Sequence, residues 1–227
     1  MRIYKYGVTL KRITENDIEL LRQWRNSDQV RRRMEYREHI TPEMQKKWFQ
    51  SINNYNNFYY LIIYKGEKVG VINEKNIDRD KGTAEAGLFI ANEKYFKSYI
   101  PLLASLILIE TNFYLLGAKI SYIRVLKDNK EGIQYNESLG YKLCEGQENV
   151  ENQLYYLTPE EFEKKTAKIR KAASRFTDSQ YPNGYVLFEQ SDYDLGIAQE
   201  FEKIVKAEDF PVEVKIEETP EGRIFYY

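Results

Sequence analysis

The spacing of apolar and polar residues changes several times along this chain. The order of these spacings predicts both strands and helices. Residues 8–13 alternate and predict a first strand. Thr14 and Asp17 then form a start signal resembling a capping box, and Thr41-Pro42 form another, so we expect two helices after this strand. The apolar runs 58–64 and 68–73 flank a Lys-Gly-Glu turn and predict a hairpin.

The next stretch, 83–145, organises the rest. It predicts a strand at 83–91, a long apolar helix at 98–116, a strand at 119–126, a short helix at 131–139 that ends at Gly140, and a last strand at 141–144. A strand–helix–strand unit of this length places two parallel strands side by side. Units of this kind bind ligands at the carboxyl ends of their strands, so we expect the chemistry there.

The last 70 residues form a separate pattern. Thr158 to Glu161 is a full capping box, and helical spacing continues to about residue 177. A turn-rich linker at 178–184 precedes a strand, a helix and two further strands, at 185–188, 195–205, 212–216 and 223–227. We expect a domain at 1–157 and a small α/β C-terminal domain at 158–227, which packs against the first or mediates formation of a homodimer.

Composition excludes several classes of protein. The formal net charge of the 227-residue chain is −1, so nucleic acid is not the default partner. Cys144 and His39 are the only residues of their types, which argues against a disulfide or a metal site built on cysteine or histidine. No apolar run is long enough to cross a membrane and the first residues do not resemble a signal peptide, so we expect a cytoplasmic protein without a membrane partner.

Several motifs in the central stretch resemble those of the GNAT superfamily of N-acyltransferases. Glu85 and Gly87 match its fourth strand, Asp128-Asn129 follow its fifth, and 129–141 resembles the segment N-x-x-A-x-x-x-Y-E-x-L-G-F. The resemblance covers about residues 7–157. It implies an α+β fold with a mixed central sheet flanked by helices, and transfer of an acetyl group from acetyl-CoA to a primary amine.

The resemblance also implies an acceptor. Trp24-Arg25-Asn26 and residues 40–48 are similar to the branch that contains bacterial amino-sugar and ribosomal-protein N-acetyltransferases. It implies a nucleotide-linked amino sugar as the acceptor, with Arg25, Asn26 and His39 lining its pocket. Arg25 and Asn26 are equally compatible with capping of the helix end.

By the same resemblance, the backbone of Leu88, Phe89 and Ile90 pairs with the pantetheine arm, and Glu85 accepts the amine proton. Glu85 is equally compatible with a carboxylate that is satisfied by a neighbouring strand. The remaining residues implied for the cofactor are Lys97, Ser98 and Asn129.

The sequence departs from the family pattern at two places. Lys97 and Tyr99 stand where a pyrophosphate loop has glycines, whose bare backbone lets phosphates approach. Asn136 stands where the family has a tyrosine that protonates the thiolate, and Tyr135 lies about 100° away around the helix. Two other functions therefore stay open: a binding or assembly module without acetyl transfer, and transfer from a different donor, such as an acyl carrier protein.

Overall fold

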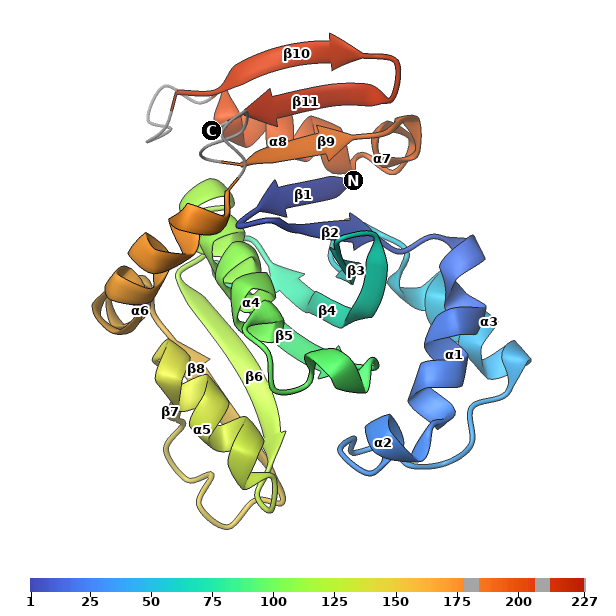
Figure 1. Cartoon of the computed structure of the whole chain (residues 1–227), viewed down its shortest axis with the longest axis vertical. Helices are drawn as coiled ribbons and strands as arrows, with labels where there is room; N and C mark the ends of the chain where they lie inside the picture. The colour runs from blue at the N-terminus through green and yellow to red at the C-terminus, as the bar shows by residue number, and fades with distance from the viewer. Residues whose placement is uncertain (178–183, 207–212, 227) are drawn as a thin grey trace.

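The computed structural model describes residues 1–177, 184–206 and 213–226, and one mixed sheet runs through them (Figure 1). The strand order is β10-β11-β9-β1-β2-β3-β4-β5-β6-β8-β7. The strands are β1 Arg2–Lys5, β2 Val8–Arg12, β3 Phe58–Tyr64, β4 Glu67–Asp78, β5 Thr83–Ile90, β6 Ile120–Leu126, β7 Lys142–Leu143, β8 Asn152–Leu157, β9 Tyr185–Phe188, β10 Lys215–Thr219 and β11 Gly222–Tyr226. The expected parallel pair is confirmed, because β5 and β6 run parallel from Thr83↔Ile120 onwards.

The helices begin and end at the signals in the sequence. They are α1 Ile18–Asn26, α2 Asp28–Arg31, α3 Pro42–Ile52, α4 Ile100–Glu110, α5 Lys130–Leu139, α6 Pro159–Ala173, α7 Gln190–Asp194 and α8 Ile197–Val205. Thr41 accepts a hydrogen bond from the Met44 N–H at the start of α3. Gly140 ends α5 with φ 104°, the left-handed conformation that favours glycine.

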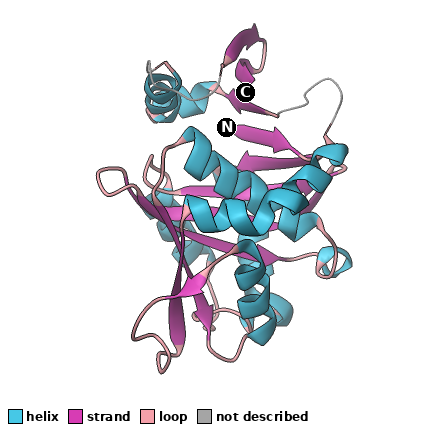
Figure 2. Ribbon diagram, turned by 90° about the vertical axis from the view of Figure 1, so that its left-hand side faces the viewer, coloured by secondary structure: helices cyan, strands magenta, loops and turns pink. Residues whose placement is uncertain are grey.

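Helices cover both faces of the sheet, which twists strongly between its two ends (Figure 2). The larger core lies between the sheet and α4, which is buried along almost its whole length. A smaller core, which includes Leu21 and Phe49, packs α1 and α3 on the opposite face. Strand β5 separates the two: Leu88 and Ile90 belong to the first core and Phe89 to the second.

The C-terminal region continues the same sheet. Strand β9 pairs antiparallel with β1, and β11 pairs with β9. Phe201 of α8, Phe188 of β9 and Phe225 of β11 form an aromatic cluster, with ring centroids 5.0–5.5 Å apart. The domain boundary at 157/158 stays a prediction. Strands from both sides of it are hydrogen-bonded to each other, since β9 pairs with β1. Most of the expected linker 178–184 and the expected strand residues Val212 and Tyr227 lie outside the described residues.

The sheet has an interior gap between β5 and β6. Their pairing spans four residue pairs and ends at Ala86↔Ile123. Beyond it, β5 continues to Ile90 along β4, and β6 continues to Leu126 along β8. The two strands therefore diverge, and we call the gap beside residues 87–90 the splay.

Candidate active site

Among the strands that the structure describes, none pairs with the edge of β5 that faces the splay. Residues 87–90 pair with β4 on one side, up to Gly70↔Ile90, while their ladder with β6 has ended. Unpaired N–H and C=O groups on a strand edge bind an extended chain that carries amides of its own. The backbone of Leu88, Phe89 and Ile90 thus offers the kind of edge that was expected for the pantetheine arm.

Glu85 lies at the closed end of the splay, two residues before the free edge. One carboxylate oxygen is 2.9 Å from the Lys75 ammonium, and the other is 3.9 Å from Nε of Arg124. The Glu85 side chain is 17 % exposed and that of Lys75 is 38 % exposed, so water reaches the pair and weakens it. The carboxylate therefore has a partner on the neighbouring strand and also stays accessible from the splay.

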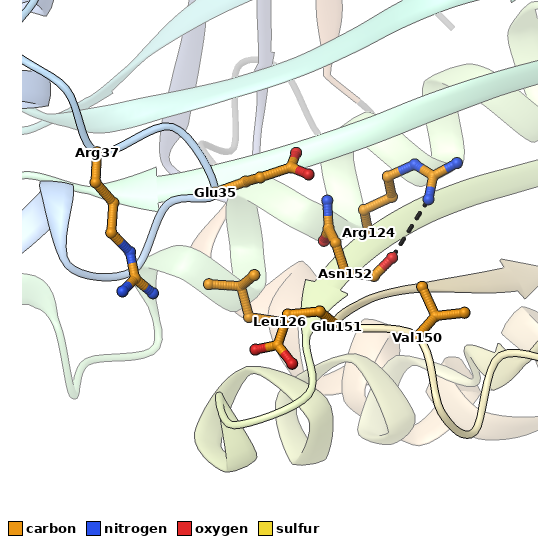
Figure 3. A pocket seen from close by; sticks show the side chains of 7 residues that line it. All are labelled: Glu35, Arg37, Arg124, Leu126, Val150, Glu151 and Asn152. Carbon is orange, nitrogen blue, oxygen red and sulfur yellow. Dashed lines mark hydrogen bonds between the residues drawn. The ribbon is translucent and has the colours of Figure 1, made fainter.

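A pocket of about 600 Å³ opens beside Arg124, the more distant ion-pair partner of Glu85 (Figure 3). Its lining residues come from the loop after α2, from the end of β6 and from the start of β8: Glu35, Arg37, Arg124, Leu126, Val150, Glu151 and Asn152. Arg124 belongs to both features, because it lines the pocket and approaches Glu85. Arg124 therefore connects the pocket to the Glu85 carboxylate.

Two residues on the α1 face complete this surface. Tyr59 packs edge-to-face against Trp48, with 5.1 Å between ring centroids. Burial and then the Glu85 charge raise the pKa of the Tyr59 phenol, while the charge of Arg25 opposes them. Tyr59 is thus electrostatically coupled both to the carboxylate and to α1.

The family assignment follows from a comparison with known proteins. The family model described as "Acetyltransferase (GNAT) domain" matches residues 8–142, more than half of the chain. The chain belongs to this acetyltransferase family. A search of curated proteins found no match.

Solved GNAT structures share the fold. FdhC, a nucleotide-linked sugar GNAT, is 19 % identical with a TM-score of 0.63, over 75 % of this chain and 97 % of that one. An aminoglycoside acetyltransferase bound to coenzyme A is 18 % identical with a TM-score of 0.60, over 69 % and 98 %. Spermidine N-acetyltransferase from Vibrio cholerae, bound to coenzyme A and spermine, is 14 % identical with a TM-score of 0.60, over 70 % and 99 %.

The start of α4 differs from a glycine-rich phosphate loop in the donors that it can offer. The N–H of Ile100 already donates to Ser98 Oγ at 3.2 Å, and Pro101 has no N–H. Tyr99 stacks on Phe176 with 5.1 Å between centroids, and its hydroxyl lies 3.0 Å from that of Tyr64. The splay therefore fits a pantetheine arm, whereas this helix end offers few backbone donors to a pyrophosphate. The exposed Lys97 is a cation near this helix end.

The two α5 residues expected near the thiolate point in different directions, as their rotation around the helix predicts. The Tyr135 hydroxyl lies 2.7 Å from Ser105 Oγ and donates to the Pro101 carbonyl at 2.9 Å, and burial raises its pKa. The Asn136 amide donates to the Gly132 carbonyl of its own helix at 2.8 Å. Their catalytic roles stay predictions.

Asn129 is the N-cap of α5, where its side chain accepts from the Gly132 N–H at 3.0 Å. Asn26 clamps the loop beside the pocket: its amide donates to the Ile40 carbonyl at 2.9 Å and accepts from the Ile40 N–H at 2.8 Å. His39 is exposed in this loop and does not line the pocket. Asn26 thus positions the loop that carries Glu35 and Arg37.

Sequence reasoning missed Lys75, Arg124 and Tyr59. Lys75 lies opposite Glu85 only because of the register of β4 on β5. Arg124 did leave a signal, since it is the charged residue within the apolar run of β6. Among the described residues, no cluster of side chains suited to a metal and no helix able to span a membrane is found.

Proposed function

We propose that this protein transfers an acetyl group from acetyl-CoA to a primary amine, and that the amine belongs to a nucleotide-linked amino sugar. The observation that carries the proposal is the unpaired edge of β5 with Glu85 at its closed end, together with a pocket large enough for a sugar on the other side of Arg124. When bound, acetyl-CoA supplies a thioester-activated acetyl group.

The chain's own residues have separate tasks in this proposal. The backbone of 88–90 holds the extended arm of the donor and directs an N–H at the carbonyl oxygen that becomes negatively charged. Glu85 accepts the proton from the amine, directly or through a water molecule. Lys75 and Arg124 keep the Glu85 side chain in place.

The sugar acceptor rests on weaker ground than the reaction. It is supported by the Trp24-Arg25-Asn26 pattern and by the shared fold of a nucleotide-linked sugar GNAT. The acceptor pocket is formed by the loop after α2, which the Asn26 clamp positions.

The test combines donor binding with turnover. We expect acetyl-CoA to bind in calorimetry, and thiol release with amino-sugar acceptors to fall about 10²- to 10⁴-fold in kcat on Glu85→Gln, with donor affinity retained. Glu137→Gln, an exposed glutamate on α5, is the matched control. No acetyl-CoA binding and no turnover with any amine would refute the proposal.

A second candidate has an observation of its own. Because the start of α4 offers few donors to a pyrophosphate, a donor that lacks the adenosine diphosphate part fits this end equally well. An acyl group on the phosphopantetheine of a carrier protein is such a donor. Acyl transfer from a charged carrier protein but not from acetyl-CoA would favour it. If neither donor reacts, the chain is a binding or assembly module.

A further inference from the structure

Arg25 is a half-buried arginine without a counter-ion. Its Nε is buried and has no hydrogen-bond partner, and no described carboxylate lies within ion-pair distance of its guanidinium. Burial lowers the pKa of the group. A buried charge without a partner costs folding free energy, so an unpaired guanidinium at this depth calls for an explanation.

Two arginines near Arg25 in the chain are paired with carboxylates. Arg22, one turn earlier on α1, lies 2.7 Å from Glu19, and Arg31 on α2 lies 2.6 Å from Asp28. Acidic residues are therefore available in this region, and Arg25 differs from the other two in being directed toward the sheet. The group that it approaches there is the Tyr59 phenol, which is neutral at physiological pH because its pKa is raised.

The charges around the reacting position are unbalanced. Near Tyr59 and Glu85 lie three cations, Arg25, Lys75 and Arg124, and the Glu85 carboxylate is their one acidic neighbour in the interactions described. The excess is thus two positive charges around Tyr59 and Glu85, and we call this part of the site its inner end. The pocket mouth carries Glu35, Glu151 and Arg37 and adds no positive excess.

We propose that the acceptor amine carries an anionic group, a carboxylate or a phosphate, and that Arg25 binds this group beside Glu85. The inference rests on the proposed acetyl transfer and narrows its acceptor. Polycations such as spermine, which is bound to the Vibrio cholerae enzyme, are poor acceptors here because the inner end already carries an excess of positive charge.

Matched acceptors test this directly with the full chain and acetyl-CoA. Glucosamine is compared with glucosamine 6-phosphate, with a nucleotide-linked amino sugar, with an amino acid and with spermine. We expect kcat/KM to be at least about 10-fold higher for an anionic acceptor than for glucosamine, and Arg25→Met to remove this preference. The phosphate and carboxylate arms distinguish the two sources of the anion.

A control variant and a binding measurement keep the result decisive. Arg175→Met removes an exposed arginine from the turn after α6, which does not line the pocket, and should leave the preference unchanged. Pyrophosphate should raise the melting temperature of the wild type and of Arg175→Met but not of Arg25→Met. Because Arg25 has no partner to lose, Arg25→Met should melt no lower than the wild type.

The inference is overturned if spermine is preferred, if Arg25→Met lowers turnover of neutral and anionic acceptors equally, or if pyrophosphate stabilises Arg25→Met as well. Its failure differs from failure of the acetyl transfer itself. If only the anion inference fails, some amine is still acetylated. If the acetyl transfer itself fails, acetyl-CoA neither binds nor reacts.

Discussion

Replacing Gly70 by alanine should damage the splay from its paired side. A Cβ at this position would lie 2.2 Å from the Phe89 carbonyl oxygen and 2.9 Å from Cα of Ile90. Both are backbone atoms of β5, so no side-chain rotation relieves the overlap. Reaching an ordinary contact of 3.4 Å requires a shift of 1.2 Å (3.4 − 2.2). Overpacking of this kind costs about 3 kcal/mol, and the displaced strand edge is the one that we propose as the donor site.

The assay is urea unfolding together with acetyl-CoA calorimetry, and Gly66→Ala is the matched control. Gly66 has φ 79° and no heavy atom within 4 Å of a built Cβ, so its substitution costs only the left-handed backbone, about 1 kcal/mol. We expect Gly70→Ala to lose more stability than the control and to bind acetyl-CoA more weakly, while the control binds normally. Equal stability loss in the two variants, with unchanged donor affinity in both, would refute the steric argument.

Two other predictions concern the buried polar groups. Burial raises the pKa of Glu74 from 4.5 to about 8, so the folded chain keeps a proton that the unfolded chain loses above pH 4.5. Stability should therefore fall as pH rises from 4.5 to 8, by about 1.4 kcal/mol per pH unit, and level off above that. Urea midpoints across this range should show the slope in the wild type but not in Glu74→Gln, and identical slopes would contradict the burial argument. Asn26→Ala removes both hydrogen bonds to Ile40 and should cost about 2 kcal/mol and raise the acceptor KM more than it lowers kcat. An unchanged KM would mean that the clamped loop does not form the acceptor pocket.

The elements most accessible from sequence were those with long, regular periods. The parallel pair β5 and β6 and the helix between them follow from apolar runs bounded by turns and caps, and the structure confirms them. Strand β1 was missed because Arg2–Lys5 is four residues long and mixes charged with apolar positions. Its partner β9 lies more than 180 residues away, a pairing that no local pattern encodes.

The candidate site shows the same division. Glu85 and Arg25 could be selected from motifs in the sequence, but their surroundings depend on tertiary structure. The Lys75 pair depends on strand register, and the missing counter-ion of Arg25 depends on how α1 lies against the sheet. Motifs thus identify candidate residues in the sequence. Tertiary packing determines that the Glu85 carboxylate is paired and that the Arg25 guanidinium is not.

The C-terminal region adds strands β9, β11 and β10 at the end of the sheet that lies away from Glu85. From β9 to β5 there are five strand steps, or about 24 Å at ordinary strand spacing, well beyond the ~8 Å range of electrostatic screening at physiological salt. Charges added to β9–β11 are therefore not felt at Glu85. What that end contributes is packing, because Phe188, Phe201 and Phe225 are buried in the larger core. The exposed surface of the C-terminal region can therefore change its charge without effect on Glu85, whereas replacing these aromatic residues should destabilise the sheet.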